Sequence, residues 1–209
     1  MGEAEEDPPQ KGLDVYLSEG WNRVNRYLAV TRSRNILRRY FAMNAFDGAM
    51  TSLGVVIGAW LGELQDPGTI IGVILTGAVA MMVSGFSGTY MTESAERNHS
   101  LNELEDAMLV DLDETIYHRA GQTVSIIAAV VDGLAPFVAS IPAVAPFLMV
   151  GALGLKVAFL SSIGLSLATL FLLGVYLGRI SGGNLLLSGA KMMVSGVAVA
   201  LIALFLNLH

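Results

Sequence analysis

The sequence contains no cysteine, which excludes disulfide bonds, thiolate metal sites and redox-active cysteine pairs. Charged residues make up only 14% of the 209 residues, and they do not provide the Arg/Lys-rich surface that nucleic acid requires. The three histidines all lie outside the long apolar runs, and the spacings typical of serine hydrolases and metalloproteases are missing from those runs. We therefore expect a protein that is not an enzyme, has no organic cofactor and does not bind nucleic acid.

Apolar residues and glycines dominate instead. Hydrophobic residues account for 54% of the chain, the mean hydropathy is +0.61, and 23 glycines suit closely packed membrane helices. A run of about 20 apolar residues crosses a hydrocarbon core about 30 Å thick. Runs near that length cover residues 41–64, 68–91, 120–144, 150–178 and 186–207. The predicted fold is an all-α, multi-pass integral membrane protein with five transmembrane helices, located in the cell membrane if the source is prokaryotic.

The basic residues predict how the chain is oriented in the membrane. Cytoplasmic connections carry an excess of arginine and lysine. The basic positions that flank the spans are 32–39, Arg97, Arg119, Arg179 and Lys191. The connection after the first span carries Glu63 and Asp66 instead. This asymmetry predicts a cytoplasmic N-terminus and a C-terminus on the outer side.

The segments outside the spans differ in character. Residues 1–12 combine acidic residues with proline and glycine, which is typical of a disordered tail. Over residues 13–40, apolar and aromatic side chains recur every three or four positions beside several arginines. This pattern predicts an amphipathic cytoplasmic helix that lies on an anionic membrane surface or docks on the protein itself. Spans one and two then occupy 41–92, an acidic cytoplasmic insert 93–119, and spans three to five 120–209.

Two aspartates lie inside apolar runs, and a glycine follows each of them. Asp47 precedes Gly48 in the first run, and Asp132 precedes Gly133 in the third, at a similar depth from the cytoplasmic side. A carboxylate in such a place costs roughly 2.5–3.5 kcal/mol and is functional by default. The alternative is a structural aspartate bonded to a nearby backbone or hydroxyl group. Prolines in the third run are expected to kink or break its helix and to free carbonyl groups that line a cavity. The aspartate pair predicts an intramembrane cation site.

The acidic insert contains carboxylates and histidines in a pattern that suits a metal ion. On a helix, steps of three and four residues place these side chains on one stripe before a break near Val110 and on another after it. Carboxylate oxygens with imidazole nitrogens suit Fe²⁺, Mn²⁺ or Zn²⁺. The alternative is a solvated acidic face. The candidate metal ligands are Glu93, Glu96, His99, Glu103, Asp106, Asp111, Glu114 and His118.

Three segments match patterns that occur together in one family of membrane proteins. In the first span, Phe46-Asp-Gly-Ala-Met-Thr-Ser-Leu-Gly-Val-Val56 is similar to the pattern Asn-Asp-Gly-Leu-x-Thr-x-Phe-Gly-Val-Val. Gly88-Thr-Tyr-Met-Thr-Glu-Ser-Ala-Glu96 and Gly178-Arg-Ile-Ser-Gly182 fit two further patterns more loosely. Over residues 35–208 the chain thereby resembles the vacuolar iron transporter family, the divalent-metal exporters of plant and fungal vacuoles and their prokaryotic relatives.

The resemblance implies a homodimer whose first spans line a central pathway, an acidic helical part in the cytoplasm, and exchange of metal for protons. Asp47 takes the position of the family's pore carboxylate, and Met108 is a soft auxiliary ligand in the insert. An ungapped alignment places Gly85 where the family has a pore methionine and Gly77 where it has a pore glutamate. The candidates to replace those two side chains are Met81, Met82 and Asp132.

The leading prediction is a proton-coupled transporter that exports Fe²⁺ or Mn²⁺ from the cytoplasm, with Zn²⁺ as a further candidate ion. Its partners are the metal ion, protons, membrane lipid and a second copy of the chain. Asp47 and Asp132 would bind metal and proton alternately, and the insert would concentrate metal at the cytoplasmic entrance. The alternative is a membrane protein that does not transport and whose acidic insert senses metal or binds a partner.

Overall fold

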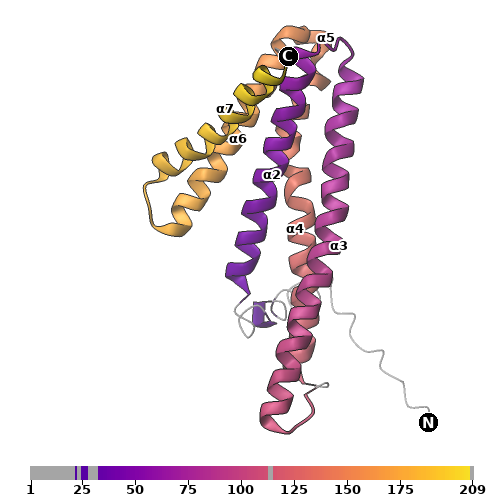
Figure 1. The fold of residues 1–209 in the computed structure, drawn as a ribbon, viewed down its shortest axis with the longest axis vertical. Helices are drawn as coiled ribbons and strands as arrows, with labels where there is room; N and C mark the ends of the chain where they lie inside the picture. Colours follow the sequence, from indigo (N-terminus) through magenta and orange to yellow (C-terminus); the bar gives the residue numbers. More distant parts are fainter. Residues whose placement is uncertain (1–21, 23–24, 28–32, 113–114, 208–209) are drawn as a thin grey trace, which may run out of the picture.

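A computed structural model of the chain describes residues 22, 25–27, 33–112 and 115–207. Figure 1 shows the helices in the order α2 (Arg34–Leu61), α3 (Pro67–Met108), α4 (Ile116–Leu148), α5 (Val150–Leu153), α6 (Leu155–Ser181) and α7 (Leu185–Asn207). Within the described residues, five of these helices, all but α5, are long and apolar enough to cross a membrane. They confirm an all-α fold with five helices of membrane-spanning length and support a multi-pass membrane protein. The predicted tail over 1–12 and most of the predicted helix over 13–40 lie outside the described residues.

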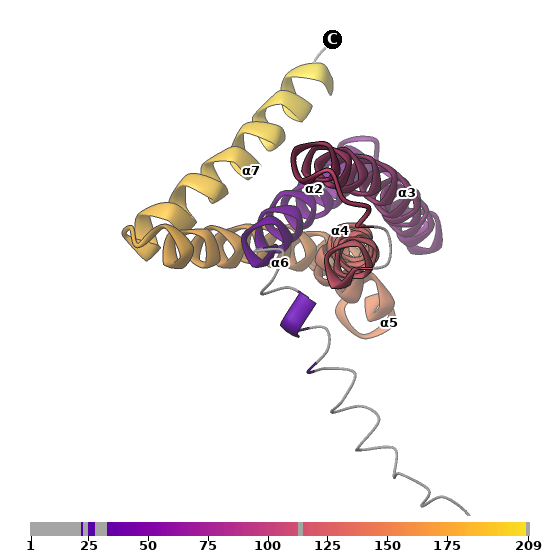
Figure 2. The ribbon, with the colours of Figure 1, turned by 90° about the horizontal axis from the view of Figure 1, so that it is seen from below.

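The helices α2, α3 and α4 form a three-helix unit in which α4 packs against both of the others. The hairpin of α3 and α4 projects beyond the start of α2 (Figure 1). The helix α6 packs against α2 and α4, and α7 packs mainly against α6. Figure 1 and Figure 2 both show the turn between α6 and α7 lying apart from the three-helix unit. Apolar side chains on α7 and on the outer side of α3 are left uncovered, as suits helices that face lipid.

Two glycines let the helices of the three-helix unit approach closely. A Cβ atom on Gly48 would lie 2.4 Å from the carbonyl oxygen of Pro136 and 2.5 Å from its Cα, so α2 and α4 meet there backbone to backbone. A Cβ atom on Gly133 would lie 2.7 Å from the Met82 carbonyl oxygen, where α4 crosses α3. Larger residues would force these helices apart. Elsewhere on α2, a Cβ atom on Gly58 would have no neighbour within 4 Å among the described residues.

The second span and the first half of the predicted insert form a single helix. The helix α3 runs for 42 residues and ends at Met108, where Leu109 adopts a left-handed conformation with φ 54°. The Glu105 carboxylate accepts a hydrogen bond from the Leu112 N–H at 2.8 Å, which holds the following turn against α3. Since α4 already begins at Ile116, the acidic insert forms the end of the α3–α4 hairpin.

Helix α4 continues through its prolines. They are Pro136, Pro142 and Pro146. The break that prolines commonly cause is absent over the described span of α4. Each proline removes only one backbone hydrogen bond of the helix, and neighbouring helices support the remaining turns. The fourth span begins at Leu155 instead of the predicted 150, since Gly154 at φ 78° separates α5 from α6.

An apolar core closes the end of the bundle where α2 terminates. Buried side chains from four helices meet there; they are Val56, Ala59, Ile70, Ile74, Ala143, Val144, Phe147, Ala158 and Phe159. Trp60 stacks on Phe159 with ring centroids 5.8 Å apart. The buried carboxylates lie in the other half of the three-helix unit, nearer the start of α2.

Asp66 caps the N-terminus of α3 in the connection between the first two spans. Its carboxylate accepts hydrogen bonds from the Thr69 hydroxyl at 2.6 Å, from the Thr69 N–H at 2.8 Å and from the Gly68 N–H at 3.2 Å. These bonds hold the pKa of Asp66 below its ordinary value of 3.8. The ionised cap therefore stabilises the fold at neutral pH.

We expect Asp66→Asn, which keeps the capping oxygen but removes its charge, to lower Tm slightly at pH 7. Because the folded-state pKa is the lower one, the advantage of the wild type is complete above the unfolded-state value of about 3.9 and disappears as the pH falls through the folded-state value. Thermal melts of both proteins between about pH 7 and pH 2 measure this difference. A difference in Tm that did not change with pH would contradict the assignment.

Candidate functional site

Asp132 on α4 is a buried carboxylate on which three candidate membrane-spanning helices converge. It is only 4% exposed. One carboxylate oxygen accepts a hydrogen bond from the Thr89 hydroxyl of α3 at 2.6 Å, and the other accepts one from the side-chain amide of Asn44 on α2. A single carboxylate thus connects α2, α3 and α4, and each of its oxygens faces a neutral oxygen- or amide-bearing side chain.

Glycines create the space that Asp132 occupies. A Cβ atom on Gly85 of α3 would lie 3.1 Å from an Asp132 carboxylate oxygen and 3.2 Å from the Cα of Gly133. A longer side chain at position 85 would therefore collide with the carboxylate. This is the position at which the family pattern places a methionine. In this chain the space beside α3 at that level is filled by a carboxylate that comes from α4.

Asp47 lies one turn beyond Asn44 on α2, and its side chain is exposed. Asn44, one turn before it on the same helix, contacts Asp132 directly. The adjoining Gly48 packs against α4, so this Asp-Gly pair directs its glycine inward and its carboxylate to the surface of the three-helix unit. The two predicted pathway aspartates are therefore neighbours, one buried and one exposed.

The methionines predicted for the pathway, Met81 and Met82, are both half-buried on α3. Met82 lines a groove of about 320 Å³ between α3 and α4, together with Phe86, Val130 and Leu134. The surface of this groove is apolar. Met82 therefore faces apolar side chains of α3 and α4 in the described structure.

Glu93 forms a second buried polar cluster, one turn beyond Thr89 on α3. It is 8% exposed. The Tyr40 hydroxyl donates a hydrogen bond to one carboxylate oxygen at 2.8 Å, and the Arg97 guanidinium binds the other at 3.0 Å. The same guanidinium nitrogen donates to the Ser33 hydroxyl at 3.0 Å. The Tyr40 and Ser33 hydroxyl groups thus join the start of α2 to an ion pair on α3.

The two clusters are consecutive parts of one polar stripe, made up of Tyr40, Asn44, Thr89, Glu93 and Asp132. Tyr40 and Asn44 are four residues apart on α2, as are Thr89 and Glu93 on α3, so the clusters lie about 6 Å apart along the helices. The Asn44 amide also donates to the Tyr40 carbonyl oxygen at 3.2 Å. The polar stripe therefore leads from Glu93 to Asp132 between otherwise apolar helix faces.

The two buried carboxylates were found from the sequence, but their partners were not. The partners are Tyr40, Asn44, Thr89 and Arg97. A signal was present, because polar residues spaced four apart occur in two otherwise apolar spans and so share a helix face. The spacing of charged residues alone does not identify the neutral side chains that donate hydrogen bonds to the two carboxylates.

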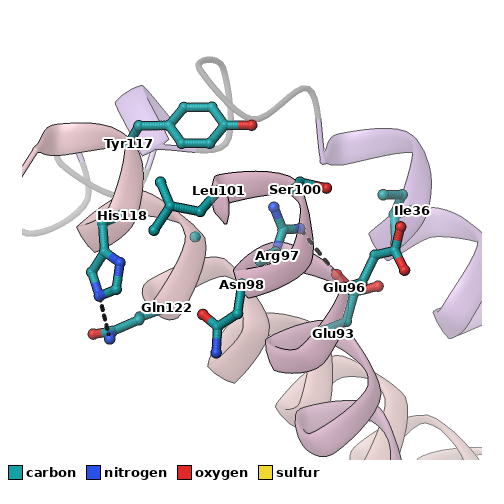
Figure 3. A pocket seen from close by; sticks show the side chains of 11 residues that line it. Ile36, Glu93, Glu96, Arg97, Asn98, Ser100, Leu101, Tyr117, His118 and Gln122 are labelled. Atoms are coloured by element: carbon teal, nitrogen blue, oxygen red, sulfur yellow. Dashed lines mark hydrogen bonds and ion pairs between the residues drawn. The ribbon is translucent and has the colours of Figure 1, made fainter. Parts of the chain in front are cut away.

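A pocket of about 240 Å³ opens beside Glu93, at the base of the α3–α4 hairpin. Figure 3 shows Glu93, Glu96 and Arg97 on α3 and His118 and Gln122 on α4 around it. The His118 Nε2 lies 2.8 Å from the Gln122 side-chain nitrogen. Three of the predicted metal ligands, Glu93, Glu96 and His118, therefore line one pocket.

The remaining predicted metal ligands are spread along the exposed part of the hairpin. The His99 ring lies 3.5 Å from the Glu103 carboxylate, and both side chains are 70% exposed. Also exposed are Asp106, Met108 and Asp111, whereas Glu114 lies outside the described residues. Within the part of the chain that the structure describes, no three histidine, aspartate or glutamate side chains are grouped closely enough to hold a metal ion. The metal-binding insert stays a prediction.

Comparison with known proteins identifies a relative. The chain is 31% identical over 172 residues to the uncharacterized protein MJ0645 of Methanocaldococcus jannaschii, a match that covers 81% of this chain and 87% of the relative. No family model matches the chain. No solved structure matches it either. The resemblance to the vacuolar iron transporter family stays a prediction.

Proposed function

The chain belongs to the same family as the uncharacterized protein MJ0645, and we propose that it is a transporter that moves Fe²⁺ or Mn²⁺ out of the cytoplasm in exchange for protons. The observation that supports this most is the buried Asp132 at the junction of three candidate membrane spans. A carboxylate at that place is costly in a membrane, so retaining it favours a role in moving ions. The Asp-Gly pattern of the first span adds support, because it resembles the corresponding pattern of the vacuolar iron transporter family.

The donors around Asp132 suit a hard divalent cation. The carboxylate and the Thr89 hydroxyl are oxygen donors, and the Asn44 side chain can turn to present its amide oxygen. Oxygen donors without thiolate favour ions such as Mn²⁺ and Fe²⁺ over softer metals. A proton can take the place of the metal, because both bind the oxygens of the buried carboxylate and offset its negative charge. This exchange is the basis of the proposed antiport.

The distribution of charge supports a proposed orientation and assembly. The α3–α4 hairpin carries Arg97 and Arg119 and lies on the cytoplasmic side in the proposed orientation, together with the start of α2. Asp47 is exposed on α2, where it would otherwise meet lipid at a cost of roughly 2.5–3.5 kcal/mol. A second copy of the chain that faces α2 would cover this carboxylate. We therefore include a homodimer in the proposal.

Flux through proteoliposomes tests the proposal. We expect saturable Mn²⁺ and Fe²⁺ flux that depends on a pH gradient, and a loss of about tenfold with Asp47→Asn, because one charged ligand is worth about 1.5 kcal/mol. The matched control is Asp66→Asn, which removes an aspartate charge outside the spans and should leave flux unchanged. Equal flux in wild type and Asp47→Asn that ignores the pH gradient would refute the mechanism.

The pocket beside Glu93 favours a second candidate function. A membrane protein that does not transport could use this 240 Å³ pocket, with Glu96 and His118 on its wall, to sense metal or to bind a partner. This function predicts saturable binding at the hairpin without flux. Calorimetry on the intact protein and the proteoliposome assay together distinguish it from transport.

A further inference from the structure

Arg97 lies where the pocket of about 240 Å³ meets the polar stripe. Its guanidinium binds Glu93, the carboxylate of the stripe that also lines the pocket. Arg97 also lines a neighbouring cavity of about 210 Å³, whose wall includes Ser94 and Gln122. A cation that leaves the pocket along the polar stripe therefore meets the Arg97–Glu93 pair before it reaches Asp132.

The Glu93 carboxylate is neutralised by a cation that belongs to the chain itself. Its two oxygens bind Arg97 and Tyr40, and the residue is 8% exposed. A buried carboxylate without a positive partner is costly, so a group that replaces Arg97 at Glu93 must itself be positively charged. A hard divalent ion would bind the same oxygens. Arg97 and such an ion therefore compete for one carboxylate.

The Arg97 guanidinium holds Glu93 through one nitrogen instead of the two-nitrogen fork that arginine can offer. That nitrogen serves both Glu93 and the Ser33 hydroxyl, each at 3.0 Å. The Arg97 Nε is buried without a hydrogen-bond partner among the described residues. In the neighbouring cavity, the Ser94 and Gln122 side chains offer oxygen acceptors. The guanidinium thus has polar surroundings into which it can move.

We propose that Arg97 is a tethered cation that occupies Glu93 and closes the route from the pocket to Asp132 until a divalent metal ion displaces it. The inference rests on the proposed transport function and adds a specificity-determining residue to it. A monovalent ion would compete less well with the guanidinium than a divalent ion does, because the attraction to the carboxylate grows with charge. The Arg97–Glu93 pair therefore favours divalent ions at the cytoplasmic entrance.

Binding of Mn²⁺ to the purified full-length protein tests this role, with free Mn²⁺ followed by its electron paramagnetic resonance signal. We expect Arg97→Gln to tighten Mn²⁺ binding about tenfold, because the competing charge is gone. Arg97→Lys should tighten it about threefold, because lysine keeps the charge but lacks the guanidinium group. Adding Glu93→Gln to Arg97→Gln should abolish the gain. Arg179→Gln on α6 is the matched control, since it removes an exposed arginine charge from outside the polar stripe, and its Mn²⁺ binding should stay within about twofold of wild type.

Each outcome decides the inference. Unchanged Mn²⁺ binding in Arg97→Gln and Arg97→Lys would overturn it, as would absence of binding in every variant. Equal tightening by Arg97→Gln and Arg179→Gln would also overturn it, because the loss of any positive charge would then explain the gain. Tighter binding in Arg97→Gln without pH-driven flux in the wild type would refute the transport function but leave Arg97 as the competitor for Glu93. Flux with unchanged binding would refute only the role of Arg97.

Discussion

Alanine at Gly48 should destabilise the protein by about 1–3 kcal/mol, which is the usual cost of forcing extra atoms into a packed contact. The added Cβ would lie 2.4 Å from the Pro136 carbonyl oxygen and 2.5 Å from the Pro136 Cα. Both neighbours are backbone atoms of α4, so they cannot turn aside as a flexible side chain can. The helices α2 and α4 must separate, and the Asn44–Asp132 contact that bridges them should weaken as well. Thermal or denaturant unfolding of the detergent-solubilised protein measures the loss.

The matched control for this prediction is Gly58→Ala on the same helix. A Cβ atom there has no neighbour within 4 Å among the described residues. Replacing glycine by alanine in an uncrowded helix position stabilises it by about 0.4–1 kcal/mol, chiefly by restricting the unfolded chain. The two substitutions should therefore differ in sign. Equal stability of Gly48→Ala and Gly58→Ala would contradict the close contact between α2 and α4.

Asp132→Asn should lower metal flux about a hundredfold, the largest functional effect that we expect. The carboxylate is the charged donor at the junction of the polar stripe, and hydrogen bonds or ligand bonds to a charged group are worth up to about 3 kcal/mol, or a factor of about a hundred. The amide has the same shape and can still bond to Thr89 and Asn44, so the fold should persist with little change in Tm. Metal flux and Tm measured on the same preparation separate loss of function from loss of folding.

A buried serine on the same helix provides the control for Asp132→Asn. The Ser140 hydroxyl, two turns further along α4, donates to the Phe137 carbonyl oxygen of its own helix at 2.7 Å. Ser140→Ala should leave metal flux at the wild-type level. If Asp132→Asn transported at the wild-type rate, or if both variants lost flux together, Asp132 would not be an ion-binding residue.

The number and positions of the spans could be predicted because membrane crossing depends on length and hydropathy alone. The fourth span shows the limit of this approach. Residues 150–154 are as apolar as the helix that follows, and a backbone conformation at Gly154 decides where α6 begins. Hydropathy carries no information about that dihedral angle.

The candidate site was predicted in part. The position of an aspartate within an apolar run singles out both Asp47 and Asp132, but only the packing of α2 and α4 at Gly48 determines that one is exposed and the other is buried. Similarly, helical spacing groups Glu93 with Glu96 on one stripe. Spacing describes which residues share a face, whereas the extent of a neighbouring helix decides which of them is covered. Glu93 lies where α2 still covers α3, so its carboxylate is buried. A buried charge needs a partner, and Arg97 of the same helix provides it.

Anomalous scattering from Mn²⁺, in crystals of the full-length protein soaked with the ion, shows directly whether the metal binds at Asp132. We expect an anomalous peak at the Asp132 carboxylate, between the Asn44 and Thr89 side chains, and loss of that peak in Asp132→Asn. Anomalous peaks confined to the exposed end of the α3–α4 hairpin, or no peak within the three-helix unit, would contradict a metal pathway through Asp132.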